Sequence, residues 1–158
     1  MRKNKLLILF ISLHLVLNSC GFKLRQPINL DFNSYALIGN VADLSSIIDK
    51  KFASANIKKS SGNSAELIIE ILRNDYTRRI LTLRGGGRVG EYEISRIIEY
   101  RFKTKGVWSE PRKLESFREF TYDPSLYNAA QAEEKLLNES INDEISRSLI
   151  TEINNLGK

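Results

Sequence analysis

EYEISRIIEYRFK, residues 91–103, decides the fold of this chain. Its apolar residues alternate with polar and charged ones, which is the two-residue period of a β-strand that buries one face. The apolar face carries Tyr92, Ile94, Ile98, Tyr100 and Phe102. The stretch therefore predicts a long strand with one face in the core.

Further strands are predicted on both sides of this stretch. Residues 65–83 favour a strand, because Leu67, Ile69 and Ile71 recur at every second position. Residues 104–111 read as a hairpin connection to a strand over 114–122, which Asp123-Pro124 ends. A short apolar strand over 34–39 comes first. Together these segments predict four strands.

Two segments have the period of an amphipathic helix. In residues 44–55 the apolar side chains recur on one face, with Asn40 as the N-cap and Asp43 three residues later. Residues 58–64 are then predicted to form a loop. In residues 129–156 an apolar residue recurs every fourth position: Leu137, Ile141, Ile145, Leu149 and Ile153. We expect an α+β fold, with a mainly antiparallel four-stranded sheet and two helices packed on one face.

RGGGR, residues 84–88, separates two of the predicted strands. The run lacks the Lys-Ser/Thr of a phosphate-binding loop and the glycine spacing of a dinucleotide site, and it leads into a strand rather than a helix. It is therefore predicted to be a flexible turn.

The N-terminus has the layout of an export signal. Arg2, Lys3 and Lys5 precede the apolar run Leu6–Leu17, and Asn18, Ser19 and Cys20 follow it. The run is shorter than the roughly 20 apolar residues that a transmembrane helix needs. The sequence LNSC at 17–20 resembles the lipobox of bacterial lipoproteins, with Asn18 as a departure from the usual small or aliphatic residue.

Cys20 is the only cysteine, so no disulfide can form within the chain. The Cys20 side chain could be a lone thiol, half of an intermolecular disulfide, or the site of lipidation. The lipobox resemblance implies a diacylglyceryl group on Cys20 with a further N-acyl chain, which is a stable anchor because several chains insert together. No other cofactor is expected.

Composition indicates one folded domain, since 42% of the 158 residues are hydrophobic and 27% are charged. We divide the chain into a signal peptide (1–19), a lipidated tether (20–34) and a single domain (35–158). Removal of the signal lowers the formal net charge from +5 to +2, because it takes three basic residues and no acidic ones. A general affinity for nucleic acid is therefore not expected.

The predicted cleavage also removes His14, the only histidine. Nucleophilic triads, histidine acid–base catalysis and the usual zinc sites then lack their essential groups. Carboxylate-only or Ser-Lys catalysis stays open, but no spacing points to it. We expect neither an enzyme nor a metal site.

Five further segments carry a resemblance to one family: CGFKLR (20–25), GEYEI (90–94), FTYD (120–123), EEKLLNE (133–139) and DEI (143–145). Together they resemble the lipopolysaccharide-assembly lipoproteins called LptE. The segments are spread over nearly the whole predicted mature chain and follow the family's order. Gln26 is a departure, because the family commonly continues with glycine there.

The resemblance implies an outer-membrane lipoprotein on the periplasmic side that plugs the LptD β-barrel, assists its assembly and takes part in lipopolysaccharide transport to the outer leaflet. Gly21 suits this location, because an acidic residue after the cysteine commonly signals retention in the inner membrane. The alternative is another periplasm-facing lipoprotein that acts as an envelope-assembly adaptor. A lipid-anchored hydrolase is disfavoured by the absent histidine.

Two groups of basic residues are candidates for contact with lipopolysaccharide phosphates or with the barrel. They flank the glycine turn and the next connection, and consist of Arg78, Arg79, Arg84, Arg88, Lys103 and Lys105. The two loops leave opposite ends of the strand 91–103, so the groups need not form one patch. The competing interpretation is that each is a solvated turn.

Overall fold

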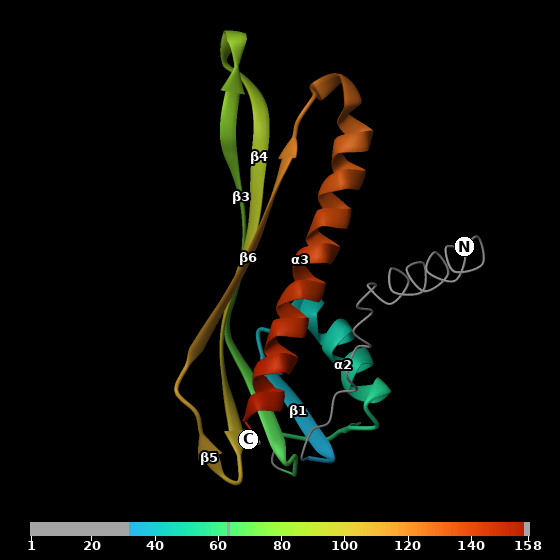
Figure 1. Cartoon of the computed structure of the whole chain (residues 1–158), viewed down its shortest axis with the longest axis vertical. Coiled ribbons are helices and arrows are strands. Elements are labelled where there is room, and N and C mark those ends of the chain that lie inside the picture. Colours follow the sequence, from blue (N-terminus) through green and yellow to red (C-terminus); the bar gives the residue numbers. More distant parts are fainter. Residues whose placement is uncertain (1–31, 63, 157–158) are drawn as a thin grey trace, which may run out of the picture.

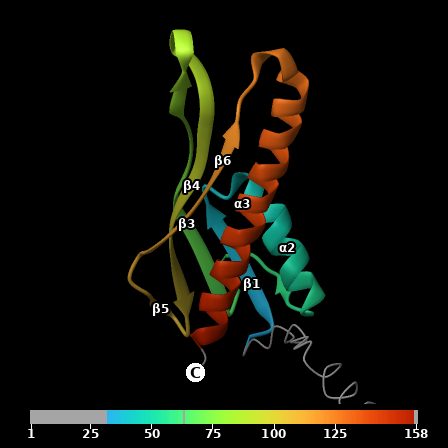
Figure 2. The ribbon, with the colours of Figure 1, turned by 45° about the horizontal axis from the view of Figure 1, so that its top comes forward.

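A computed structural model describes residues 32–62 and 64–156 as one sheet with two helices on one face (Figures 1 and 2). The strands are β1 (Ser34–Gly39), β2 (Lys58–Lys59), β3 (Leu67–Arg84), β4 (Arg88–Thr104), β5 (Val107–Trp108) and β6 (Arg112–Thr121). The helices are α2 (Ser45–Ser54) and α3 (Tyr127–Asn155). The predicted α+β class is confirmed.

The sheet has the strand order β2-β1-β3-β4-β5, and β6 also pairs with β4. β1 runs parallel to β2 and β3, and the other pairs are antiparallel. The described residues thus form six strands where four were predicted, because β2 and β5 are additional strands of two residues each. Such short pairings leave no periodic pattern in the sequence.

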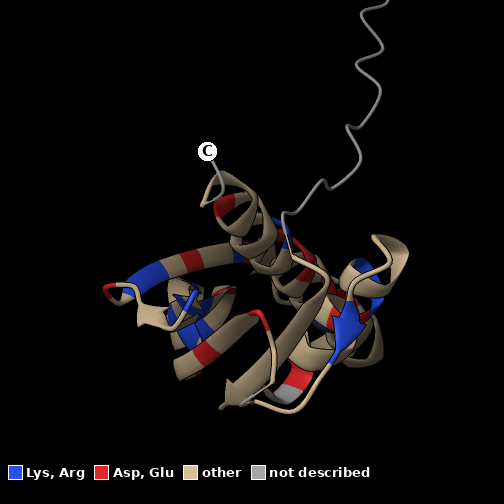
Figure 3. Cartoon of the chain, turned by 90° about the horizontal axis from the view of Figure 1, so that it is seen from below, with Lys and Arg blue, Asp and Glu red and all other residues tan. Residues whose placement is uncertain are grey.

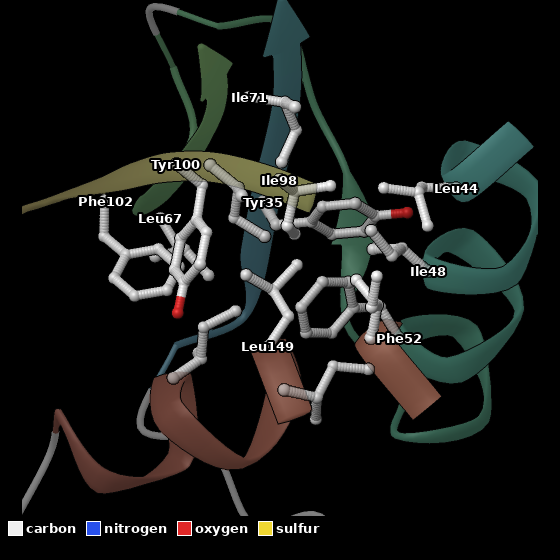
Figure 4. Packing of buried hydrophobic residues seen from close by; sticks show 14 of the residues in the cluster. Tyr35, Leu44, Ile48, Phe52, Leu67, Ile71, Ile98, Tyr100, Phe102 and Leu149 are labelled. Carbon is white, nitrogen blue, oxygen red and sulfur yellow. The ribbon is translucent and has the colours of Figure 1, made fainter. Parts of the chain in front are cut away.

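The apolar core lies around β1, the first residues of β3 and the second half of β4. Tyr35 of β1 packs against Phe52 of α2, with 4.4 Å between the ring centroids. Ile145 and Leu149 of α3 complete the core, and both are at most 1% exposed. Figure 4 shows Tyr35, Phe52 and Leu149 meeting between the strands and the helices. The predicted apolar stripe of the last helix is confirmed, with Leu137 half-buried at its edge.

β3 changes its inward-facing residues at Leu72. Ile71 pairs with Tyr100, but Arg73 pairs with Glu99, so Leu72 is an extra residue that forms a bulge. A bulge reverses the alternation of the side chains beyond it. The inward positions are therefore odd-numbered up to Ile71 and even-numbered from Asn74 to Ile80, after which the register shifts again. In this second part they are largely polar.

The predicted N-cap of the first helix is wrong. A 3₁₀ turn over Ala42–Leu44 precedes α2, whose N-cap is Leu44. Asn40 instead continues the end of β1: its backbone N–H donates to the Ile71 carbonyl at 3.1 Å, and its carbonyl accepts from the Asn74 amide at 3.1 Å. Gly39, at φ 89°, allows this approach, because a Cβ there would lie 2.2 Å from the Ile71 oxygen.

The signal peptide, Cys20 and most of the tether lie outside the described residues. Phe32 is the first residue described, and its ring meets Phe52 edge-on at 6.4 Å. Within the described part, neither helix is long and apolar enough to cross a membrane.

Candidate functional site

The two candidate basic groups lie at opposite ends of β4. Arg84 pairs with Arg88 at one end of the β3–β4 hairpin, and Leu67 pairs with Thr104 at the other. At about 3.3 Å per residue, the 17 residues of β4 separate these ends by about 50 Å. The prediction that the two loops leave opposite ends of the strand is confirmed.

The glycine end consists of Ile80, Leu83, Arg84, the turn Gly85–Gly87 and Arg88. Gly86 and Gly87 have positive φ angles of 77° and 73°, which a side chain would strain. Ile80 and Leu83, which precede Arg84 by four residues and by one residue in β3, are 53% and 63% exposed. This end therefore presents cations and apolar side chains together.

Within the described residues, Arg84 and Arg88 form no ion pair. Their positive charge does reach Asp123. The pKa of Asp123 lies below its ordinary value, mainly because Ser125 donates two hydrogen bonds to it and further because of Arg84 and Arg88. Both guanidinium groups keep donors available for an external anion.

Arg78 points inward and connects the hairpin to α3. Its Nε lies 3.3 Å from a carboxylate oxygen of Glu134, and its guanidinium lies 3.6 Å from the centroid of the Tyr92 ring. Tyr76 donates a hydrogen bond to the same Glu134 at 3.0 Å. The contacts of Arg78 are therefore structural.

Arg79 lies on the opposite face of the sheet. It donates two hydrogen bonds to Glu93, at 2.7 and 2.8 Å. These bonds lower the pKa of Glu93 and raise that of Arg79. A bidentate pair leaves Arg79 less available to an external phosphate than Arg84 or Arg88.

The tryptophan end consists of Lys58, Lys103, Lys105, Val107 and Trp108. Lys105 and Gly106 have positive φ angles of 49° and 81°, the conformation of a tight two-residue hairpin turn. The Lys103 ammonium lies 5.7 Å from the Trp108 ring centroid. The structure thus joins Lys103 and Lys105 to exposed apolar side chains that the sequence analysis did not single out.

A buried arginine also escaped the sequence analysis. Arg96 is 7% exposed on the inward face of β4, between two apolar positions. It donates to Asn142 of α3 at 2.5 Å and to Asp43 at 3.1 Å. Its burial could have been predicted, because position 96 is one of the even-numbered positions that face inward in the alternating stretch 91–103.

Next to Arg96, a second polar group connects β6 to α3. Glu144 accepts hydrogen bonds from Ser116 and Arg118, both at 2.7 Å. These bonds lower the pKa of Glu144. No group of three His, Cys, Asp or Glu side chains that could hold a metal occurs in the described part of the chain.

The chain resembles several solved lipoproteins in fold. Lipoprotein B from Nitrosomonas europaea has a TM-score of 0.70 at 22% identity, covering 82% of this chain and 88% of that one. Rare lipoprotein B from Shewanella oneidensis has a TM-score of 0.67 at 22% identity, with coverage of 80% and 100%. A minor lipoprotein from Acinetobacter baumannii has a TM-score of 0.64 at 19% identity, with coverage of 80% and 93%. No curated protein matches the chain.

A family model identifies the relationship that these structures leave open. The model described as "LptE: Lipopolysaccharide-assembly" matches residues 26–153. The match includes both ends of the sheet and nearly all of α3, and the family is defined by an assembly role rather than by a catalysed reaction. The chain belongs to the LptE family and has a role in lipopolysaccharide assembly.

Proposed function

We propose that this protein is an outer-membrane lipoprotein that plugs the LptD β-barrel, assists the barrel's assembly and helps to pass lipopolysaccharide to the outer leaflet. The observation that carries the proposal is the family match over residues 26–153. The shape of the protein is compatible with such a plug, because α3 runs alongside the sheet and the β3–β4 hairpin extends at one end (Figure 1).

The anchor in this proposal is Cys20, which follows an export signal within LNSC. Acyl chains on Cys20 hold the domain on the periplasmic side of the outer membrane. The body then needs no spanning segment of its own.

Within this function, the glycine end is the site of contact with the phosphates of lipopolysaccharide. Arg84 and Arg88 present guanidinium groups without an ion pair among the described residues, and Ile80 and Leu83 offer apolar surface beside them. Guanidinium binds phosphate through two parallel hydrogen bonds, and exposed apolar side chains suit acyl chains. Arg78 and Arg79 support the hairpin through Glu134 and Glu93.

Co-purification tests the partner. The lipidated protein, extracted from outer membranes in detergent, is expected to bring down a β-barrel protein in stoichiometric amount together with lipopolysaccharide. A different envelope machine in place of the barrel would favour the adaptor function instead.

Charge removal tests the glycolipid site. Arg84→Ala with Arg88→Ala should weaken lipopolysaccharide binding at least about tenfold, since charge-assisted hydrogen bonds contribute about 1.5–3 kcal/mol each. The matched control is Arg73→Ala with Lys113→Ala, which removes the same charge from ion-paired positions elsewhere on the sheet. A second pair, Lys103→Ala with Lys105→Ala, reports on the tryptophan end.

Each variant should be measured at two salt concentrations. The salt dependence should become shallower for the Arg84 and Arg88 pair alone, because that pair removes cations that face phosphate. Wild-type binding with wild-type salt dependence in this variant would exclude the glycine end as the glycolipid site.

A further inference from the structure

The tryptophan end lies at the same end of the strands as the point where the predicted tether enters the fold. One row of strand pairs crosses the sheet, from Lys59 through Tyr35, Leu67 and Thr104 to Val107. With strands about 4.8 Å apart, this row is about 19 Å wide. Phe32, Lys58 and Lys105 all lie just beyond the row, on its outer side.

The turn at this end presents two apolar side chains to the solvent on a well-defined hairpin. Val107 is 71% exposed and Trp108 is 36% exposed. Ser109 closes the hairpin, because its backbone N–H donates to the Phe102 carbonyl at 2.7 Å and its hydroxyl accepts from the Phe102 N–H at 3.0 Å. The exposure of the two residues thus belongs to a hydrogen-bonded element.

Cations surround this apolar pair. The Arg101 guanidinium lies 4.3 Å from the Trp108 ring centroid, and Lys103 and Lys105 flank the turn. Lys58 is exposed at the far side of the same edge. Figure 3 views the molecule from this end and shows basic segments on both flanks.

Most of the acidic side chains near this end of the sheet already have a hydrogen-bond or ion-pair partner. Glu66 accepts a hydrogen bond from the Asn33 backbone at 2.9 Å, and Asp49 pairs with Lys59 at 2.7 Å. Glu70 is paired with Arg101 at 2.5 Å, which leaves Glu110 as an exposed acid beside β5. Lys58 and Lys105 form no ion pair in the described part of the chain.

The length of the tether connects this end to a membrane. Residues 20–32 span at most about 47 Å when fully extended. The glycine end lies about 50 Å farther along the hairpin, by the rise per residue of β4. A lipid on Cys20 therefore lies within tether length of the tryptophan end, whereas the glycine end is farther from the point of attachment than the extended tether is long.

We propose that the tryptophan end docks on the anionic phospholipid surface that holds the anchor, with Val107 and Trp108 at the level of the headgroups and Lys58, Lys103 and Lys105 facing lipid phosphates. Tryptophan with flanking lysines is the composition that favours a membrane–water interface, and basic residues are attracted to anionic lipids. This inference rests on the lipid anchor of the proposed function. It gives the body a fixed orientation, with the glycine end directed away from that surface.

Trp108 is the only tryptophan, so its fluorescence reports on this end alone. The lipidated protein is reconstituted into vesicles of phosphatidylethanolamine and phosphatidylglycerol. The emission of Trp108 should shift to shorter wavelength and be quenched by lipids that carry bromine near the headgroup end of the acyl chain. The matched control carries Leu83→Trp with Trp108→Phe, which moves the probe to the glycine end and should show neither effect.

Two further variants test the contacts. Val107→Asp should abolish the quenching without a change in thermal midpoint, because Val107 is largely exposed. In the chain from residue 20 onward with Cys20→Ala, Lys58→Gln and Lys105→Gln should each weaken partition into the vesicles about fivefold.

The outcomes separate the docking from the anchor. Protein that floats with the vesicles while Trp108 stays unquenched would keep the anchor and overturn the docking. Protein that does not float would refute the anchor, and the unlipidated chain would then decide the docking by the same quenching. Equal quenching of the Leu83→Trp probe, or an emission shift only after the barrel protein is added, would also overturn the docking.

Discussion

Arg96 shows at the scale of one residue how the sheet and the helix recognise each other. Its guanidinium is held by Asn142 and Asp43, while its Nε has no hydrogen-bond partner. Burying a charge costs desolvation free energy, and hydrogen bonds to such partners offset only part of this cost. Arg96 therefore favours one arrangement of α3 on β4 without adding much net stability.

This asymmetry predicts unequal effects when the two sides of the contact are substituted. Arg96→Met should change the free energy of unfolding by less than about 1 kcal/mol, because an apolar side chain replaces the buried cation. Asn142→Leu should lower it by about 2–3 kcal/mol, because the buried guanidinium loses an acceptor. Urea denaturation of both variants checks the ranking, and a larger loss for Arg96→Met would contradict it.

Glu144 predicts a pH dependence. Hydrogen bonds from Ser116 and Arg118 hold its folded pKa below the ordinary 4.5. The carboxylate therefore contributes stability above the unfolded pKa, and the contribution is lost as the pH falls through the folded value. It should be at most about 1 kcal/mol, because the side chain is 45% exposed.

Comparison with Glu144→Gln measures this contribution. The difference in free energy of unfolding between wild type and variant should be constant near neutral pH and shrink below about pH 4, where the unfolded carboxyl takes up its proton. A difference that grows as the pH falls would show that the folded pKa is raised instead.

At the scale of an element, α3 is held by one stripe of its surface. Ile145→Asp places an unpaired carboxylate where the side chain is 1% exposed, and it should lower the free energy of unfolding by several kcal/mol, comparable with the stability of a whole domain. Leu136→Asp is the control on the same helix, at 65% exposed, and should cost less than about 0.5 kcal/mol. Thermal denaturation of both variants checks the stripe, and equal midpoints would contradict it.

The long elements were predictable because each carries a period that continues over most of its length. β4 alternates at every second residue, and α3 repeats its aliphatic residues at every fourth, so burial follows from the spacing. β3 was predicted as a strand, but the reversal of its faces was not. The bulge at Leu72 depends on pairing with a strand far along the chain, and no local pattern announces it.

The candidate site was predictable in position but not in partners. Charge runs beside a glycine turn located the basic residues, and strand order placed the two groups apart. The position of α3 against the hairpin decides that Arg78 pairs with Glu134. The same position decides that the donors of Arg84 remain available. Trp108 was not predicted as a site residue, because only the fold brings it to the same end of the sheet as Lys58 and Phe32.

At the scale of the whole molecule, the two halves are held together by different interactions. Around α2 and β1 the core is apolar, whereas beyond the Leu72 bulge the contacts of β3 with α3 are polar, through Tyr76 and Arg78. Polar contacts at a surface contribute less to stability than apolar burial. The predicted tether enters at the apolar half. In the proposed function the anchor is therefore attached to the more stable half of the fold, and the glycine end is the half held by weaker contacts.

In the proposed function, the location of the protein depends on Cys20 rather than on the folded body. Cys20→Ala should leave the protein in the periplasmic fraction or as an uncleaved precursor, because the remaining tryptophan-end contact is too weak to replace several inserted acyl chains. Fractionation in a strain that lacks the barrel partner measures this, since the barrel itself could retain the protein. Full recovery of the variant with outer membranes from that strain would show that lipidation is not the anchor.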